Sequence, residues 1–147
     1  DMLVDRGANV TAEESHGWEP IHLASFGGHT AVVETLVRRG ASVGTTDHDG
    51  KQPLHGASMN GHEKLVERLV ELGANVSAGT RLGAQPLHFA AYKGHAAVVE
   101  RLVALGASVR ATDERGNVPA HWAEFGGHKK VIEALVRGAK SVRGEEL

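Results

Sequence analysis

The sequence predicts an all-α solenoid, in which helix–turn–helix units stack one after another with hairpin-like loops between them. The first observation behind this prediction is that the four prolines recur every 33 residues, at Pro20, Pro53, Pro86 and Pro119. The second is that eight of the ten histidines keep the same spacing, in two series that begin at His22 and His29. A fixed period of this length is typical of repeat architectures.

The period divides the 147-residue chain into a partial unit and four full units: residues 1–15, 16–48, 49–81, 82–114 and 115–147. We expect one domain over residues 1–147, because each unit can bury its apolar face only against its neighbours. The partial unit matches the second half of a full unit, which indicates a fragment of a longer stack. The last unit is one residue shorter near its end than the others.

Each full unit predicts two helices and a loop, as residues 82–114 illustrate. The first helix is expected to begin at Pro86, because the N–H that proline lacks would be unpaired in a first helical turn. It is expected to end at Gly94 in the left-handed conformation. A second helix is expected over residues 97–105, with a buried face made of Val98, Val99, Leu102 and Leu105. Residues 107–116 carry turn residues and no helical period, which predicts an extended, hairpin-like loop.

Four segments in the same register carry a common motif. They read Glu-Pro-Ile-His-Leu-Ala, Gln-Pro-Leu-His-Gly-Ala, Gln-Pro-Leu-His-Phe-Ala and Val-Pro-Ala-His-Trp-Ala, from residues 19, 52, 85 and 118. Each is followed by Gly-His, then by Val-Val-Glu-x-Leu-Val or a near variant, then by Gly-Ala. In these motifs the sequence resembles the ankyrin repeat family over almost the whole chain. The resemblance implies an ankyrin-repeat solenoid with a concave groove beside its hairpins.

The sequence departs from the family's pattern at two repeat positions. The signature threonine, a helix N-cap in the family, is replaced in the four units by Glu19, Gln52, Gln85 and Val118. Losing such a cap typically costs about 1 kcal/mol. We expect the Glu and Gln side chains to reach the signature histidine, which Val118 cannot do. Glu124 stands where the family has an alanine close to a neighbouring helix, which fits a terminal unit with a polar outer face.

The composition excludes several classes of function. The chain has 16 Lys and Arg residues against 18 Asp and Glu residues, so we expect no nucleic-acid partner. No apolar run is long enough to span a membrane, so we expect no membrane insertion. The chain has no cysteine, which excludes disulfides and Cys-ligated metals and fits a reducing compartment. We expect an intracellular monomer, cytoplasmic or nuclear.

The sequence offers no support for catalysis. It contains neither a Gly-x-Ser-x-Gly elbow nor a glycine-rich phosphate loop followed by Lys-Ser or Lys-Thr. Histidines spaced one per repeat lie too far apart to converge on one zinc ion, so the eight periodic histidines are expected to be structural. We therefore expect no enzyme activity, no cofactor and no metal.

Partner-binding residues are expected where large apolar side chains recur at one repeat position. The first such set stands where each first helix ends, and in the ankyrin family this position faces the concave groove. It comprises Phe26, Met59, Tyr92 and Phe125. The alternative is that these side chains only pack between adjacent first helices. A second set, for which core or inter-repeat packing is favoured, comprises Leu23, Phe89 and Trp122.

The loops and the second helices carry further candidates. Trp18 lies in a hairpin tip, where burial is difficult, so we expect it to contact a partner. The polar candidates on the hairpins are His16, His48, Lys51, Arg81 and Arg115. On the convex side, the i, i+4 spacing predicts helix-stabilising pairs between Glu34 and Arg38 and between Glu133 and Arg137.

The predicted function is non-enzymatic recognition of a partner protein or peptide on the concave groove and hairpin tips. Two alternatives remain open. The chain could be a targeting or regulatory segment of a larger enzyme, channel or ubiquitin-ligase adaptor, which the full-length sequence would reveal. It could also be an enzyme itself, which a polar cluster in a closed pocket would indicate.

Overall fold

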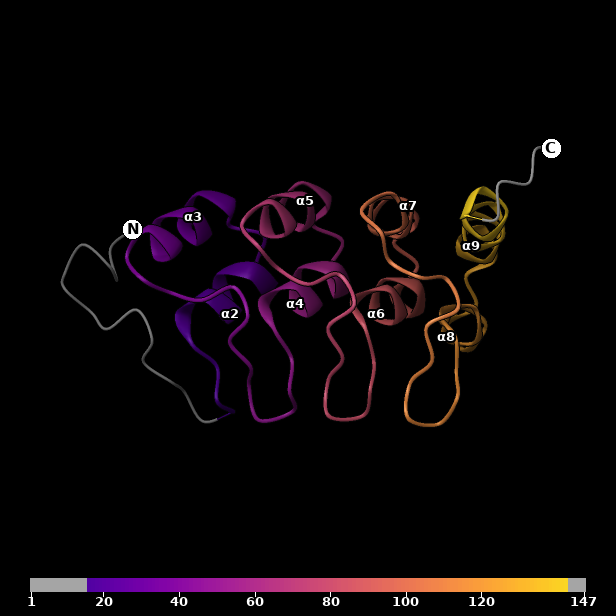
Figure 1. Ribbon diagram of the computed structural model, residues 1–147, viewed down its shortest axis with the longest axis horizontal. Coiled ribbons are helices and arrows are strands. Elements are labelled where there is room, and N and C mark those ends of the chain that lie inside the picture. The colour runs from indigo at the N-terminus through magenta and orange to yellow at the C-terminus, as the bar shows by residue number, and fades with distance from the viewer. Residues whose placement is uncertain (1–15, 143–147) are drawn as a thin grey trace.

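The predicted all-α solenoid is confirmed. The computed structural model describes residues 16–142, and their side chains through residue 140; within this part of the chain there are helices and loops but no strands. Four helix pairs stand side by side along one axis, and a long loop projects from the same side of the stack between one pair and the next (Figure 1). The predicted partial unit, residues 1–15, lies outside the described residues.

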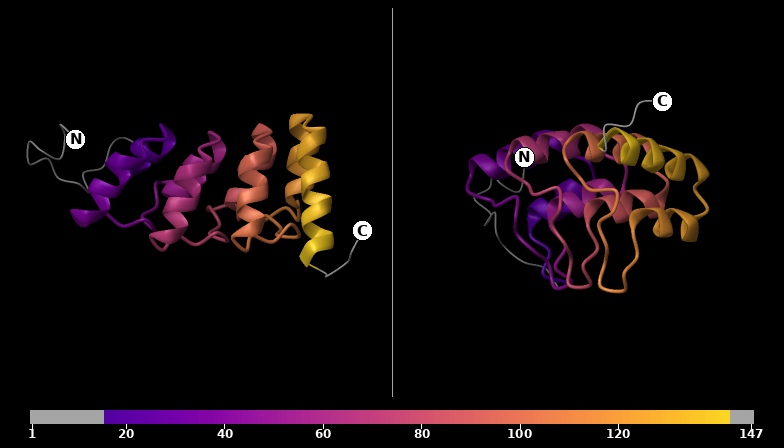
Figure 2. Two further views of the ribbon diagram at one scale, coloured as in Figure 1. Left: turned by 90° about the horizontal axis from the view of Figure 1, so that it is seen from above. Right: turned by 45° about the vertical axis from the view of Figure 1, so that its right-hand side comes forward.

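The helices form two layers. The first helices of the units are α2 (Pro20–Phe26), α4 (Pro53–Met59), α6 (Pro86–Lys93) and α8 (Pro119–Gly126). The second helices are α3 (Thr30–Arg38), α5 (Glu63–Glu71), α7 (Ala96–Ala104) and α9 (Lys129–Val142). Figure 2 shows the second helices side by side in one view and, in the other, the hairpins projecting beyond the layer of first helices. The first helices and the hairpins therefore make up one face of the stack.

The core lies between the two layers and runs along the whole stack. Its largest fully buried apolar side chains are Ile21, Val33, Leu36, Leu54, Leu65, Val66, Leu69, Leu87 and Leu102. In the unit of residues 82–114, Val98, Val99 and Leu102 are buried as predicted, whereas Leu105 is only partly buried. Leu105 stands at the C-terminal cap of α7, because the helix ends one residue earlier than predicted, and it packs against the core from there.

The signature histidines fix the start of each first helix. Each proline is the first helical residue, as predicted. In α4, His55 Nδ1 accepts the backbone N–H of Gln52 at 2.8 Å, while its Nε2 donates to the carbonyl of Ala78 in the following loop at 2.7 Å. The prediction that the side chain replacing the family's threonine would reach the histidine is wrong, because the backbone N–H takes that place. Val118 can therefore occupy the same position as Gln52, because its backbone N–H donates to His121 Nδ1 at 3.2 Å.

The hairpins are joined to one another by backbone hydrogen bonds near their tips. The N–H groups of His48, Arg81 and Glu114 donate to the carbonyls of His16, Asp49 and Leu82, at 3.0, 2.9 and 2.8 Å. Each tip turns at a glycine with positive φ, for example Gly83 at 78°. An added Cβ at Gly83 would lie 3.0 Å from the backbone nitrogen of Glu114, so both the conformation and the close approach favour glycine.

The shortened last unit ends differently from the others. The preceding second helices stop at Arg38, Glu71 and Ala104, before glycines with positive φ, whereas α9 continues to Val142. Gly138 therefore lies inside the helix. A Cβ there would sit 3.1 Å from Val103 and 3.2 Å from Val109, so the glycine allows α9 to pack closely on the preceding unit. Glu124 is exposed, as expected for a polar outer face.

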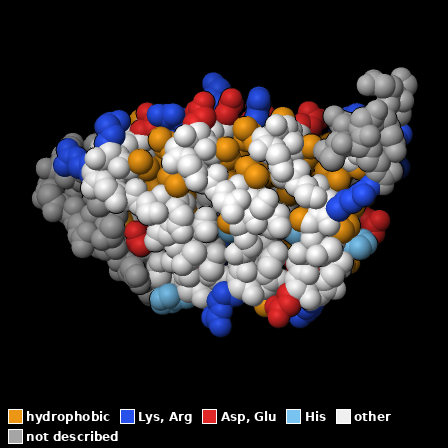
Figure 3. All heavy atoms as spheres, viewed as in Figure 1, with side chains coloured by type: hydrophobic (Ala, Val, Ile, Leu, Met, Phe, Trp, Pro, Cys, Tyr) orange, Lys and Arg blue, Asp and Glu red, His pale blue; other side chains and the backbone are white. Residues whose placement is uncertain are grey.

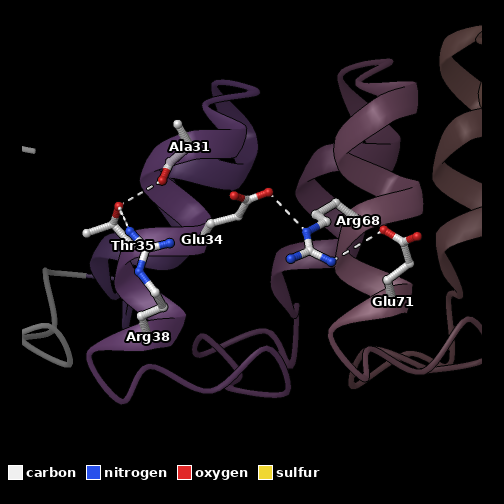
Figure 4. Close-up of polar contacts among 6 residues, drawn as sticks. All are labelled: Ala31, Glu34, Thr35, Arg38, Arg68 and Glu71. Carbon is white, nitrogen blue, oxygen red and sulfur yellow. Dashed lines mark hydrogen bonds and ion pairs between the residues drawn. The ribbon is translucent and has the colours of Figure 1, made fainter.

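Ion pairs on the convex face connect neighbouring units. Arg68 Nε lies 3.0 Å from Glu34 Oε1, and Arg137 Nη2 lies 3.3 Å from Glu100 Oε1. The predicted pairs between Glu34 and Arg38 and between Glu133 and Arg137 are therefore wrong. Arg38 instead donates to the Thr35 hydroxyl on its own helix, at 3.0 Å, and Figure 4 shows the two arrangements together.

The same pattern of ion pairs occurs in the middle of the stack. Arg101 lies 3.5 Å from Glu63 and 3.7 Å from Glu67, both on the preceding second helix. Figure 3 shows charged side chains along the edge that the second helices form. These side chains are about half exposed, and exposed pairs contribute roughly 0–1 kcal/mol each. The convex face thus pairs many of its own charges and is only weakly stabilised by doing so.

Candidate functional site

Large apolar side chains are exposed at the ends of the first helices. Phe26, Tyr92 and Phe125 are 49%, 44% and 70% exposed, and Met59, at the same repeat position, is partly buried. Three of the four side chains are thus exposed to solvent. This exposure argues against the alternative in which they only pack between adjacent first helices.

The backbone at this repeat position is held by the next unit. The carbonyl of Phe26 accepts hydrogen bonds from Asn60 Nδ2 at 2.8 Å and from His62 Nε2 at 2.9 Å. The carbonyl of Met59 accepts one from His95 Nε2, also at 2.9 Å. The histidines that follow the first helices therefore lock the C-terminal ends of α2 and α4, and the exposed side chains project from a fixed backbone.

A hollow of about 910 Å³ opens between the last two first helices and the adjacent hairpins. Its apolar wall comprises Leu82, Ala84, Phe89, Tyr92, Trp122 and Phe125. Its polar rim comprises Asp49, Lys51, Thr80, Arg81, Asp113, Glu114, Arg115 and Asn117. A large hollow that combines an apolar wall with polar groups is typical of a binding site.

The wall of this hollow is a cluster of aromatic rings in edge-to-face contact. The ring centroids of Phe89 and Trp122 lie 5.5 Å apart, and those of Tyr92 and Trp122 lie 6.1 Å apart, with interplanar angles of 76° and 86°. Phe89 and Trp122 belong to adjacent units, so the predicted inter-repeat packing of these two residues is confirmed. The prediction is wrong for Leu23, which is 39% exposed. All three residues line the groove side of the stack.

A smaller hollow of about 60 Å³ lies at the other end of the groove, between α2 and α4. Trp18, Leu23, Phe26 and Met59 form its apolar lining, together with Gly56. Gly56 occupies the repeat position that holds a leucine, a phenylalanine or a tryptophan in the other units. A Cβ on Gly56 would lie 3.6 Å from Phe26, so the missing side chain is what leaves this hollow open.

Two aspartates anchor the hairpins beside the hollows. Asp47 Oδ2 accepts the Trp18 indole N–H at 2.9 Å, and Asp113 Oδ2 accepts that of Trp122, also at 2.9 Å. Trp18 is 37% exposed and is therefore held against the next hairpin rather than standing free on a tip. Burial by itself would raise the pKa of Asp113, but hydrogen bonds from the Asn117 backbone and the Trp122 indole outweigh burial and lower it.

Lys51 lies where the two hollows meet. It is the one residue in the described part of the chain that lines both of them. Its ammonium nitrogen lies 5.8 Å from the centre of the Phe89 ring, within cation–π distance. The structure records no carboxylate ion-paired with this ammonium group among residues 16–140. The groove thus has a single central cation.

The remaining predicted residues lie on the hairpin tips. His16, His48, Arg81 and Arg115 are exposed, and Arg81 Nη1 donates to the His48 carbonyl at 3.3 Å. Arg81 and Arg115 line the larger hollow, whereas His16 and His48 line neither hollow. The imidazole of His16 lies instead 5.3 Å from the Trp18 ring.

The buried signature histidines act as structural groups. His55 and His88 are fully buried, and burial lowers the pKa of both, for His55 to about 4. The neutral ring accepts one backbone N–H and donates to one carbonyl, so both nitrogens are occupied. Within residues 16–140, no three His, Asp or Glu side chains come close enough together to hold a metal ion.

Sequence reasoning missed part of the site. Gly56 and Leu82 line the hollows but are not among the predicted residues, and for Phe89 and Trp122 the sequence favoured packing over a place in the site. Alignment of the units contained a usable signal, because one repeat position carries large apolar residues in three units and glycine in the fourth. The signal identifies the position but not its exposure, which depends on the side chains of the neighbouring unit.

Comparisons with known proteins agree with the geometry. A family model described as ankyrin repeats (3 copies) matches residues 1–80, and a second, described as ankyrin repeats (many copies), matches residues 69–123. No curated protein matches the chain. None of the helices in the described residues has both the length and the apolar character that a membrane span requires.

Proposed function

Because the chain belongs to the ankyrin repeat family, whose repeats are generally protein–protein interaction modules, we propose that it binds a partner protein or peptide in the groove between its first helices and its hairpins. The partner contacts the two hollows and the hairpin tips. In this proposal the chain acts as a monomer, without catalysis and without a cofactor.

The observation that carries this proposal is the exposed aromatic wall of the larger hollow. Tyr92 and Phe125 remain 44% and 70% exposed beside the half-buried Phe89 and Trp122. Exposed apolar patches rimmed by polar groups are typical of interaction sites. Aromatic side chains in a pocket are also the residue types on which binding energy concentrates.

The proposal is tested by capture from a native lysate with three forms of the protein, followed by quantitative mass spectrometry. The wild type is compared with the double variant Tyr92→Ala/Phe125→Ala and with Lys64→Ala, a change of an exposed residue on α5. Proteins that bind the wild type and Lys64→Ala but not the double variant are the expected result. If the double variant, shown to be folded, captures the same proteins as the wild type, the groove is not the binding surface.

A further inference from the structure

We infer that Asn60 is a site of spontaneous deamidation, in which the side-chain amide becomes a carboxylate, and that the product weakens the contact between the first two described units. Asn60 follows Met59 at the end of α4, and its Nδ2 donates to the Phe26 carbonyl at 2.8 Å. Phe26 and Met59 both line the smaller hollow, so the modified residue stands at the edge of the candidate site. The reaction consumes only water, and the inference goes beyond the proposed function without depending on it.

The glycine that follows Asn60 makes it the asparagine most open to this reaction. The other three asparagines each precede a valine: Asn9, Asn75 and Asn117. The backbone nitrogen of Gly61 attacks Cγ of Asn60, a nitrogen–carbon bond forms, and Nδ2 leaves as ammonia with the proton of the attacking nitrogen. Water then opens the resulting succinimide ring at either of its carbonyls, which gives aspartate or isoaspartate. The attacking nitrogen is unhindered in glycine, which has no Cβ, and is shielded in valine, which is branched at Cβ.

The folded structure slows the reaction without preventing it. Asn60 and Gly61 are both partly exposed, so water reaches them. The N–H of Gly61 donates to the Ser58 carbonyl at 3.3 Å, whereas the equivalent bonds of the other units are 3.0–3.2 Å long. The Asn60 amide stays on the Phe26 carbonyl as long as the end of α4 is formed. Helix ends fray, and each local opening releases both the amide and the attacking nitrogen.

Deamidation reverses the polarity of the contact at the Phe26 carbonyl. An amide nitrogen donates hydrogen bonds, whereas a carboxylate oxygen only accepts them. The carbonyl therefore loses one of its two side-chain donors, keeps His62 Nε2 at 2.9 Å, and faces an oxygen atom that repels it. The asparagine is particular to this unit, since the equivalent residues of the others are Gly27, Lys93 and Gly126. The contact between α2 and α4 is thus the one that the modification weakens.

The modification is tested by incubating the wild type at mildly alkaline pH, in its native state and in urea, followed by peptide mapping with mass spectrometry. The loss of the amide is read as a mass increase at the residue concerned. In the native protein Asn60 is expected to convert several times faster than Asn75, which is exposed but precedes Val76. Unfolding is expected to accelerate conversion at Asn60 more than at Asn75, because it removes the hydrogen bond to Phe26.

Two results of this experiment contradict the inference. Conversion of Asn60 that is no faster than that of Asn75 in the native protein refutes the modification site. An equal acceleration of both residues on unfolding shows that the contact with Phe26 does not restrain the amide, and it refutes the protective role of the hydrogen bond.

The consequence is tested with Asn60→Asp, which supplies the aspartate product directly. Urea denaturation is expected to give an unfolding equilibrium constant about fivefold larger than that of the wild type, because one hydrogen bond is lost. Asn60→Ala removes the donor without adding a charge and is expected to show a similar or smaller effect. The matched control is Asn75→Asp, which makes the same change of charge where the side chain accepts the Ser77 N–H at 2.9 Å. It is expected to leave the constant within about twofold of the wild-type value.

The stability measurements decide the second half of the inference. If Asn60→Asp is as stable as the wild type, or no less stable than Asn75→Asp, the modification does not weaken the contact between the units and this half fails. Each of these outcomes leaves the proposed function untouched, because capture with Tyr92→Ala/Phe125→Ala tests that function separately.

Discussion

The imidazole of His62 donates a hydrogen bond from Nε2 to the carbonyl oxygen of Phe26, 2.9 Å away and 36 residues earlier in the chain. The bond joins the start of one second helix to the end of the preceding unit's first helix. It therefore connects His62, which supports the stacking of the units, with Phe26, which belongs to the candidate binding surface.

Removing this hydrogen bond should destabilise the contact between the first two described units. His62→Ala leaves the Phe26 carbonyl with Asn60 as its remaining side-chain donor, and we expect a loss of about 1 kcal/mol in the free energy of unfolding. The control is His29→Ala, at the same repeat position but exposed. Urea denaturation of both variants measures the effect. Equal stability of the two variants would show that the bond contributes nothing.

Acid should destabilise the protein through His55. Its pKa falls from 6.5 to about 4 on folding because the ring is buried, although hydrogen bonds to carbonyl groups act in the opposite direction. The unfolded state therefore binds more protons between these two pH values. The contribution of His55 to the free energy of unfolding is fully present above pH 6.5. About 3 kcal/mol of it is lost as the pH falls toward 4.

His55→Asn is expected to be less stable at neutral pH and to lose less further stability between pH 6.5 and 4 than the wild type. The matched control is His121→Asn, which changes the exposed member of the same series. Chemical denaturation at a series of pH values gives the two slopes. An unchanged slope in His55→Asn would assign the acid sensitivity to other groups.

Replacing a buried hydroxyl should stabilise the stack. Ser58 is fully buried on α4, and its Oγ has no hydrogen-bond partner among the described residues. Ala91, at the same position on α6, is equally buried. We expect Ser58→Ala to raise the free energy of unfolding by about 1 kcal/mol, because the unpaired hydroxyl is removed from the interior.

The reverse change, Ala91→Ser, supplies the control and should lower stability by a similar amount. Thermal melts of the two variants are sufficient, since about 1 kcal/mol shifts the melting temperature of a protein this size by a few degrees. Destabilisation by Ser58→Ala would indicate that the hydroxyl has a partner in solution.

Tyr92 should contribute to binding far more than to stability. Its ring is 44% exposed and makes edge contact with Trp122. Tyr92→Ala is therefore expected to weaken binding of a groove ligand by about 2 kcal/mol while changing the melting temperature by only a few degrees. Lys64→Ala should change binding by less than about 0.5 kcal/mol. Arg101, although convex, is unsuitable as a control because it pairs with Glu63 and Glu67 on the preceding unit.

The two measurements on Tyr92→Ala discriminate between the competing roles of this residue. If the ring only packs between helices, the variant loses stability clearly, and its binding falls only in proportion to the unfolded fraction. Calorimetric titration with a captured partner, beside a thermal melt, gives both quantities from one preparation.

The sequence predicted the fold in detail because each element depends on local chemistry. Pro86 and Gly94 bound α6 as expected, since proline lacks an N–H and glycine accepts a positive φ. The ion pairs were less predictable. The i, i+4 spacing places Glu34 near Arg38, but the arginine of the next unit, Arg68, reaches Glu34 as well, and sequence spacing alone does not rank the two partners.

The candidate site was predictable by repeat position but not by exposure. Tyr92 and Phe89 lie three residues apart on one short helix, and both were identified as recurrent large residues. Which of them is exposed depends on the neighbouring unit, because Trp122 covers part of Phe89 with its ring. The open slot beside Gly56 likewise results from a missing side chain; the repeat alignment marks its position but not the walls that Phe26 and Met59 give it.

The stacking of units on their immediate neighbours also has a consequence for how the chain folds. The helix pairs that make the main contacts belong to the same unit or to adjacent units, so contacting residues lie near each other along the chain. Chains with such low contact order close only short loops before they gain native contacts, and they fold fast for their size. Folding can therefore begin at any adjacent pair of units and spread in both directions, so the folding rate should depend little on the number of units in the stack.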